Sequence, residues 1–599
     1  MKKLEAKYPR ELVVVGVHSA KFQEEKESQN IVQAILRYGI EHPVINDSDM
    51  LVWRRFGVNA WPTLVLIDPE GFVVWAQSGE TTFEALDAIL APAVAFYDKR
   101  GLLDRSPVHF VTESSRAART PLRFPGKVLA DEAGERLFIA DSGHHRIVVC
   151  RLDGQVVDVI GDGIPGLRDG AWSEARFCSP QGMAILGDRL LVADTENHAI
   201  REIDFTKRTV RTVAGTGVQR RRPPVMRMGP PLQAELSSPW DLCVVGEWVY
   251  IAMAGCHQIW RMDTALTGIG PYAGNAREDI VDGPLLPPSA YALGFASFAQ
   301  PSGLATDGEW LYVADSEGSS IRAVPLQPRG EVRTIVGTSR LLAARLFTFG
   351  DRDGPPDQVL LQHPIGVCYG NGFLYVADTY NNKIKRIDPR TGTTMTLVGD
   401  RQAGDTNDPP RFDEPAGITF ARDRLFVADT NNHAIRVIEL QPTLKVTTLA
   451  LKGLEPPPAV EEKGTFPEDK VDLRQEPVVR LRPGGTIKLQ ILFEFLAGFG
   501  LNPNVPTDLV IERLSDQGVD SAGDKQVVRI PPGEGPLEVS LTGLNSNVKS
   551  LRIVCTYFWC EKSGRGLCRI GTVGWLVPVQ WADDGEDSIV LKHRVGGGS

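Results

Sequence analysis

Two cysteines near the C-terminus are the residues with the clearest capacity for chemistry. Cys560 and Cys568 flank the segment Glu-Lys-Ser-Gly-Arg-Gly-Leu, which is typical of a hairpin loop. Cysteines on the two strands of a hairpin can approach each other, so this pair is a candidate redox switch. A disulfide that only stabilises the domain and two unpaired thiols are the alternatives. The spacing of a four-cysteine zinc site is absent, so we expect no metal here.

An aspartate that recurs along the middle of the chain is the second candidate. It lies in six copies of one phrase, such as LYVADTYNNKI at 374–384, and several copies carry a histidine a few residues later. Asp, Thr and Asn side chains bond nearby backbone in turns, so we expect this aspartate to be a structural turn residue. The third copy has Met253 instead, which marks either a specialised surface or a degenerate repeat. The repeated aspartates are Asp141, Asp194, Asp315, Asp378 and Asp429.

The elements that must position these aspartates are short strands. Each copy follows a Pro-x-Gly turn or a near variant, and runs such as LYVA at 374–377 are rich in β-forming residues. Four short strands per repeat, at periods between 51 residues (378 to 429) and 63 residues (315 to 378), indicate propeller blades. Six repeats predict a six-bladed β-propeller over residues 121–451. Its histidines would be spread around the ring, so we expect neither a shared metal site nor a metal-dependent lyase.

Two further patterns resemble known families. The Asn-His-Ala-Ile phrases at 197–200 and 432–435 resemble the NHL repeat, which forms six-bladed propellers. Residues 1–100 alternate β and α patterns, and Trp61 and Pro62 resemble the place where thioredoxin-like domains hold a cis-proline beside the active site. The order of these parts resembles the NHL-repeat-containing protein 2 family, whose members join a thioredoxin-like domain, a propeller and a C-terminal β domain.

The thioredoxin-like part departs from its family at the essential motif. Thioredoxin chemistry needs a Cys-x-x-Cys pair in which one thiol is activated. The chain has no cysteine before Cys150, and its first residues, MKKLEAKYP, resemble the end of the helix that follows such a pair. Either the chain begins late or it has lost the redox centre. We therefore interpret Trp61 and Pro62 as remnants of the scaffold, with a surviving binding groove as the alternative.

The remaining segments complete the domain plan. Residues 101–120 and the proline-rich, charged residues 452–476 are predicted to be linkers. Residues 477–595 contain roughly seven short strands, which predict an immunoglobulin-like β-sandwich. The predicted fold class is therefore multidomain and mostly β, with a partial α/β thioredoxin-like domain, a six-bladed NHL propeller and a C-terminal sandwich.

Composition narrows the classes of function. The chain has 599 residues and a net charge of −10, and no stretch approaches about 18 uninterrupted apolar residues, which argues against a membrane span. The acidic balance argues against nucleic-acid binding, and we interpret the cluster Arg220, Arg221, Arg222 and Arg227 as a solvated loop. The N-terminal residues lack a signal-peptide pattern, which favours the cytoplasm.

These observations favour a non-catalytic scaffold that binds a protein or peptide partner through its propeller. We expect no catalytic residue, metal or cofactor, because nothing in the sequence assembles a nucleophile, a base and an oxyanion site. The alternative is a thiol–disulfide oxidoreductase whose Cys-x-x-Cys lies upstream of Met1 or whose switch is Cys560 and Cys568. The partner, the propeller face that it uses and the oligomeric state stay open.

Overall fold

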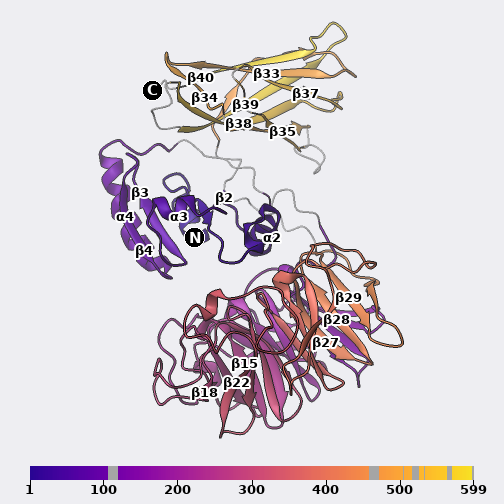
Figure 1. Ribbon diagram of the computed structural model, residues 1–599. Coiled ribbons are helices and arrows are strands. Elements are labelled where there is room, and N and C mark those ends of the chain that lie inside the picture. The colour runs from indigo at the N-terminus through magenta and orange to yellow at the C-terminus, as the bar shows by residue number, and fades with distance from the viewer. Residues whose placement is uncertain are drawn as a thin grey trace. The chain divides into compact units, whose positions relative to one another are not determined.

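The computed structural model describes residues 1–105, 113, 119–457, 471–503, 505–515, 525–531, 533, 535–562 and 569–595. The chain divides into two compact units, one formed by Met1–Ala117 with Val460–Ser599 and the other by Ala118–Ala459. Figure 1 shows a small mixed α/β region at the N-terminus, the propeller, and a β domain at the C-terminus. This is the mostly β, multidomain architecture that the sequence predicts.

The N-terminal region contains two separate pairs of strands within its described residues. Strands β1 and β2 pair in parallel, and β3 pairs antiparallel with β4. Helix α4 begins at Thr82, whose hydroxyl caps the Ala85 N–H at 3.2 Å, and packs Leu90 against Leu4 and Tyr8. The elements are α1 (Lys2–Lys7), β1 (Gly16–His18), η1 (Glu24–Lys26), α2 (Ser28–Tyr38), β2 (Val44–Asn46), α3 (Leu51–Arg55), β3 (Thr63–Ile67), β4 (Val73–Ser78) and α4 (Phe83–Lys99).

The second unit is a propeller whose six blades all lie in residues 119–457, a range that the structure describes without a gap. Each blade is an antiparallel sheet whose first and innermost strand starts at or just after a proline, which belongs to a Pro-x-Gly turn in blades two, four, five and six. The first three blades are β5 (Lys127–Asp131), β6 (Arg136–Asp141), β7 (Arg146–Arg151) and β8 (Val156–Ile160); β10 (Pro180–Leu186), β11 (Arg189–Asp194), β12 (Ala199–Asp204) and β13 (Thr209–Ala214); and β14 (Pro239–Val245), β15 (Trp248–Met253), β16 (Gln258–Asp263) and β17 (Ile269–Ala273).

Blades four to six repeat this order and close the ring onto blade one. The Thr430 hydroxyl donates to Pro125 O at 2.9 Å, and Ala130 N–H donates to Thr419 Oγ1 at 3.2 Å. Short strands β9 (Gly170–Ala171) and β18 (Gly283–Pro284) extend the outer edges of blades two and four. The last three blades are β19 (Pro301–Thr306), β20 (Trp310–Asp315), β21 (Ser320–Pro325) and β22 (Glu331–Val336); β23 (Gly366–Gly370), β24 (Phe373–Asp378), β25 (Lys383–Ile387) and β26 (Thr394–Val398); and β27 (Pro415–Ala421), β28 (Arg424–Asp429), β29 (Ala434–Glu439) and β30 (Lys445–Thr448).

The C-terminal β domain packs a three-stranded sheet, β37-β33-β40, against a larger sheet around β38 and β39. Both sheets contribute to one core, in which Trp575 is completely buried. The strands are β31 (Leu473–Gln475), β32 (Val479–Leu481), β33 (Ile487–Phe495), β34 (Phe499–Leu501), β35 (Thr507–Leu514), β36 (Lys525–Ile530), β37 (Leu537–Leu541), β38 (Ser550–Glu561), β39 (Arg569–Trp581) and β40 (Ser588–Val595).

The propeller has two distinguishable faces. Strand direction alternates within a blade, so the turn between the second and third strands lies at the same end as the loop that enters the next blade. We call this end the motif face, because the repeated aspartate phrase forms those turns, such as Thr379–Asn381 after β24. The opposite end carries the hairpins between the first and second strands and is called the hairpin face.

Candidate functional site

The repeated aspartates are the most regular polar feature of the motif face. All five are fully buried. At Asp194, Oδ1 accepts the Cys178 N–H at 2.7 Å, while Oδ2 accepts bonds from Asn197 Nδ2 and Arg201, both at 2.8 Å. Each carboxylate thus ties the turn that follows it to the chain that enters the same blade. The equivalent Oδ1 bonds come from the N–H groups of Arg123, Ala299, Gln362 and Asp413.

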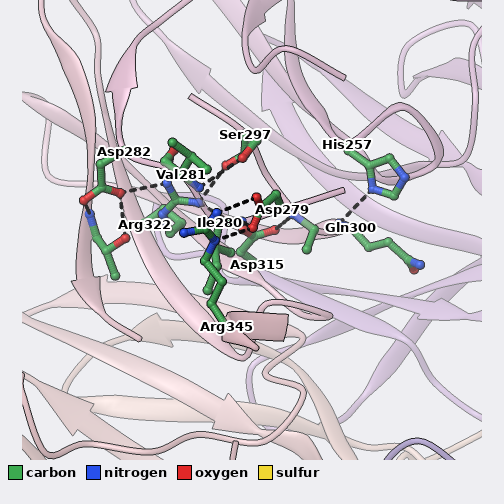
Figure 2. A network of polar contacts seen from close by, with 12 residues as sticks. His257, Asp279, Ile280, Val281, Asp282, Ser297, Gln300, Asp315, Arg322 and Arg345 are labelled. Atoms are coloured by element: carbon green, nitrogen blue, oxygen red, sulfur yellow. Dashed lines mark hydrogen bonds and ion pairs between the residues drawn. The ribbon is translucent and has the colours of Figure 1, made fainter. Parts of the chain in front are cut away.

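A buried cation accompanies each of these carboxylates. Figure 2 shows Arg322 between Asp315, at 3.2 Å, and Asp282, at 2.9 Å, with further bonds to the carbonyls of Ser297 and Val281. Burial raises the pKa of Asp315 to about 7, although the Arg322 guanidinium opposes that change. The other blades use a cation five or seven residues after the aspartate, namely Arg146, Arg201, Lys385 and Arg436.

Blade three replaces both members of the ion pair. Met253 takes the aspartate position, and its sulfur accepts the Ser237 N–H at 3.3 Å. Trp260 occupies the position of the cation, and its Nε1 donates to Gln258 Oε1 at 3.0 Å. The carboxylate and the cation have therefore been lost together, which leaves no unpaired buried charge in this blade.

The histidines of the repeated phrase join neighbouring blades. His198 has a left-handed backbone, with φ at 48°, and its Nδ1 accepts the Ser238 N–H of blade three at 3.1 Å. Burial, and then the charge of Arg221, lower the pKa of His198 to about 4. The side chains of His145, His257, Ser319, Asn382 and His433 make the equivalent inter-blade bond.

The repeated phrase is thus occupied with contacts within and between blades. Its polar atoms are in contact with groups of the propeller itself. His144 contacts Asp141 within blade one, and the other histidines of the phrase each serve a different blade boundary. Within the described residues, no group of three or more His, Cys, Asp or Glu side chains could hold a metal ion. The phrase therefore offers no assembled chemistry on the motif face.

A single ion pair lies on the propeller axis. Lys127 starts the inner strand of blade one and donates to Asp241 Oδ2 of blade three at 3.2 Å, to Ser302 O at 2.7 Å and to Ile365 O at 2.8 Å. Burial lowers the pKa of Lys127, although Asp241 opposes that change. Asp241 Oδ2 also accepts the Leu304 N–H at 3.0 Å. These bonds use all three protons of the ammonium group and join four blades across the axis.

Lys127 and Asp241 occupy a position that is glycine in the other four blades. The strand registers align Lys127 with Ala140 and Asp241 with Ala252, as Gly303 aligns with Ala314. A Cβ on Gly303 would lie 2.5 Å from Ile365 O, because the inner strands approach closely here. The equivalent glycines are Gly182, Gly366 and Gly417.

A cavity of about 310 Å³ runs along the axis with Lys127 and Asp241 among its lining residues. The rest of its wall is mostly apolar and comes from all six inner strands. Because the ammonium and the carboxylate already bond one another and the backbone, the cavity presents a closed polar pair between apolar walls. One lining residue from each blade is Leu129, Ile185, Val244, Thr306, Tyr369 or Phe420.

Trp61 and Pro62 lie on the surface of the N-terminal region. Their peptide bond is cis, the isomer expected from the sequence. Trp61 is 47% exposed, contacts Trp53 in a tilted arrangement with ring centroids 4.4 Å apart, and donates from Nε1 to Ser19 O at 2.8 Å. Asp47 accepts the Ser19 hydroxyl at 2.8 Å and caps the start of α3. These contacts fix the positions of both tryptophan residues.

The cysteines fall into two groups. Cys560 ends β38 and is disulfide-bonded, whereas its proposed partner Cys568 lies outside the described residues. The six other cysteines, all described, are not in disulfides. Burial raises the pKa of Cys150 and Cys243 to about 12 and that of Cys256 to about 11, so these thiols are poor nucleophiles at neutral pH.

Comparisons with known proteins place this arrangement in a family. The family model described as thioredoxin-like matches residues 1–73, and the NHL repeat model matches residues 177–203, 361–387 and 412–438. The chain is 37% identical to human NHL repeat-containing protein 2 over 96% of its own length and 82% of that protein. The chain belongs to the NHL repeat-containing protein 2 family. The resemblance found in the sequence is confirmed.

Other matches cover less of their counterparts or show only shape. The chain is 44% identical to Arabidopsis thaliana Protein SUPPRESSOR OF QUENCHING 1, chloroplastic, over 76% of the chain but only 44% of that protein. It is 13% identical to virginiamycin B lyase from Staphylococcus aureus, with a TM-score of 0.33, over 55% of the chain and 85% of the lyase. Within the described residues of this family member, no helix is long and apolar enough to cross a membrane.

A group of exposed apolar side chains on the motif face beside blade four leaves no signal in the repeat pattern. Two long inter-blade loops, 274–300 and 337–365, each carry exposed large apolar side chains. Such loops have no fixed period, so the repeat pattern could not reveal them, although their length was a usable signal. The members of this blade-four patch, with their exposed fractions, are Tyr291 (44%), Leu293 (76%), Leu341 (39%), Leu342 (99%) and Phe347 (61%).

Polar bonds hold the two loops of the blade-four patch together. Arg345 forms a two-pronged ion pair with Asp279, at 2.6 and 2.9 Å, which is visible in Figure 2. Arg345 also donates to Leu341 O at 2.9 Å, and Arg277 donates to Tyr291 O at 2.9 Å. Burial opposes ionisation of Asp279, but the Arg345 guanidinium outweighs it and lowers the pKa of that carboxyl.

Proposed function

We propose that this protein is a non-catalytic scaffold that binds a protein partner through the motif face of its propeller. The observation that carries the proposal is the blade-four patch. Leu342 is 99% exposed and Phe347 is 61% exposed, although both belong to a loop with defined hydrogen bonds. Clustered exposed apolar side chains are a feature of protein interaction sites, whereas isolated ones are ordinary.

The loop that presents Leu342 and Phe347 is ordered by its own contacts. Thr338 donates its hydroxyl to Arg345 O at 2.7 Å, and Thr348 donates to Ala344 O at 2.9 Å. These bonds close the segment from 338 to 348 on itself, and the ion pair to Asp279 anchors it to the neighbouring loop. A loop that is ordered before binding loses less conformational entropy when a partner docks, which favours affinity.

The proposal gives the thioredoxin-like region a structural role. Residues 1–149 contain no cysteine, so the printed region has no thiol for dithiol exchange. We propose that it acts as a further surface of the scaffold, to which the half-exposed Trp61 and its neighbour Trp53 contribute.

Paired variants of the full chain test the proposed function. Leu342→Asp with Phe347→Asp places charge in the blade-four patch, and Leu444→Asp is the control, because Leu444 is 46% exposed elsewhere on the propeller. Immobilised chains would be compared for the proteins that they retain from an extract of the source organism. We expect the double variant to lose partners that the control retains. Equal retention by both variants would contradict the proposal.

Thiol–disulfide exchange is the second candidate, and the disulfide at Cys560 favours it. The other described cysteines are free, so Cys560 is chemically set apart. Differential alkylation of the native protein, with and without reductant, would show whether Cys560 cycles between oxidised and reduced states. The cytoplasmic location stays a proposal too, and a persistently oxidised Cys560 would argue against it, since cytosolic thiols are normally kept reduced.

A further inference from the structure

We propose that the blade-four patch recognises a short peptide segment with apolar anchors next to an acidic side chain. This inference rests on the proposed function and adds the chemistry of the partner. It comes from two features that lie in the same loop: apolar side chains that are exposed to solvent, and the Arg340 guanidinium, which has no partner among the residues that the structure describes.

The apolar part of the recognition is concentrated in few side chains. Leu342 and Phe347 lie on the closed segment 338–348, and Leu293 is 76% exposed on the neighbouring loop. The contact from Arg345 to Asp279 joins the two loops that carry these three side chains. A few large apolar residues commonly supply most of the affinity of a protein interface.

The charged part of the recognition comes from arginines beside the same side chains. Arg340 is exposed, directly precedes Leu341, and makes no hydrogen bond or ion pair with any residue that the structure describes. Arg277 is also exposed, although its Nε donates to Tyr291 O. The positive charge of Arg345 is matched by Asp279.

An unpaired guanidinium favours a partner carboxylate over other charges. Arginine presents several N–H donors in a planar fork that fits a carboxylate in two-pronged geometry. At the rim of an apolar contact, such a pair mainly sets specificity and the rate of association, while the apolar anchors supply affinity. The blade-four patch therefore fits an acidic, apolar peptide better than a basic one. Nucleic acid fits it less well, because contacts to phosphate groups are polar and do not involve exposed leucine side chains.

The experiment uses a random dodecapeptide display library as the probe and the full chain as the target. Binders would be counter-selected against the Leu342→Asp, Phe347→Asp double variant, and synthesised for affinity measurement by fluorescence polarisation. We expect selected peptides to pair leucine or an aromatic residue with aspartate or glutamate. Arg340→Glu should weaken them about fivefold, and the weakening should shrink at high salt. Leu444→Asp is the matched control and should leave binding unchanged.

The other outcomes separate the inference from the function on which it rests. Peptides that require Leu342 and Phe347 but lack acidic residues, or that ignore Arg340→Glu, would overturn the inferred chemistry and leave the docking function in place. Failure to select any peptide that depends on the patch, together with unchanged retention of extract proteins by the double variant, would overturn both. Binding of polyuridine RNA that is lost in Arg340→Glu and kept in the double variant would replace the peptide by nucleic acid.

Discussion

The propeller and the thioredoxin-like region differ in how far neighbouring strands cover the edges and faces of their sheets. In the propeller, every inner strand contacts the next blade, and the last blade bonds to the first through Thr430 and Pro125. In the described N-terminal residues, β1 and β3 belong to separate two-stranded sheets, and Val15 and Val17 are 48% and 43% exposed. Contacts between successive blades therefore stabilise the propeller, whereas the N-terminal region depends on a small core.

The difference is also one of chemistry. The propeller uses the buried polar residues of its repeats to hold blades together, and five of its exposed large apolar side chains lie on the two loops beside blade four. Structural chemistry and candidate recognition are thus separated within one domain. The predictions below test that separation, beginning with the contact on which stability depends most.

Removing the axial cation should have the largest effect. Lys127→Met leaves the buried Asp241 carboxylate without its counter-charge, and we expect a loss of about 3–5 kcal/mol in the free energy of unfolding. The double variant Lys127→Gly, Asp241→Gly restores the glycine found in the other blades and should recover most of this loss. Urea unfolding followed by tryptophan fluorescence would measure both. A double variant as unstable as the single one would show that the pair does not act as a unit.

Restoring the repeat consensus in blade three should also destabilise it. Met253→Asp buries a carboxylate opposite Trp260, where no cation is available, and we expect a cost of roughly 3 kcal/mol. Adding Trp260→Arg should return part of that stability, because blades two, four and six pair an aspartate with an arginine seven residues later. Thermal unfolding of the three chains decides the point. Tolerance of Met253→Asp alone would mean that this aspartate site does not require its cation.

The inter-blade histidines should make stability depend on pH. The pKa of His198 is lowered to about 4 in the folded chain, against about 6.5 when unfolded, so the unfolded chain binds the proton more tightly. Its stabilising contribution is complete above pH 6.5 and falls as the pH drops toward 4. His198→Asn should keep the bond, as Asn382 does in blade five, and remove this part of the pH dependence.

The controls for His198 separate the bond from the titration. His198→Ala leaves the Ser238 N–H without its acceptor, and we expect a loss of about 1–3 kcal/mol at pH 7. Urea midpoints at pH 7 and pH 5 would be measured for the three chains. If His198→Asn kept the full pH dependence of the unsubstituted chain, the titrating group would lie elsewhere.

The ion pair that joins the two patch loops should matter least for stability. Arg345 and Asp279 side chains are 25% and 29% exposed, so Arg345→Ala should cost less than about 1 kcal/mol. Hydrogen exchange of residues 338–348 should nevertheless become faster, and binding through the patch should weaken severalfold as the ordering is lost. Unchanged exchange in this segment would mean that the loop is held by its internal bonds alone.

The sequence predicted the propeller because its signal is repeated. The run at 374–377 falls within β24, and the aspartate turn after it recurs in five of the six blades. The axial pair was not predicted, because Lys127 and Asp241 are 114 residues apart and meet only once the ring closes. The sequence shows Asp241 in blade three at the position where other repeats have glycine. It does not show that Lys127 of blade one is the partner of Asp241.

In the N-terminal region, the apolar pattern of the sequence extends beyond the strand that forms. Residues 11–17 have the apolar pattern of a strand, but β1 extends only from Gly16 to His18 in the structure. Apolar pattern alone does not make a strand, because pairing requires a neighbour for the backbone groups of residues 11–15. The blade-four patch was missed for a related reason, since its side chains face solvent and leave no periodic pattern.

Site-specific photo-crosslinking tests the central claim most directly. A photoreactive phenylalanine analogue would be placed in the full chain at Leu342, and in a second chain at Leu444, and each would be irradiated in an extract of the source organism. The account predicts a discrete crosslinked partner at position 342 that is absent at 444 and is reduced by Arg345→Ala. Equal crosslinking at both positions, or a discrete partner only at 444, would contradict it.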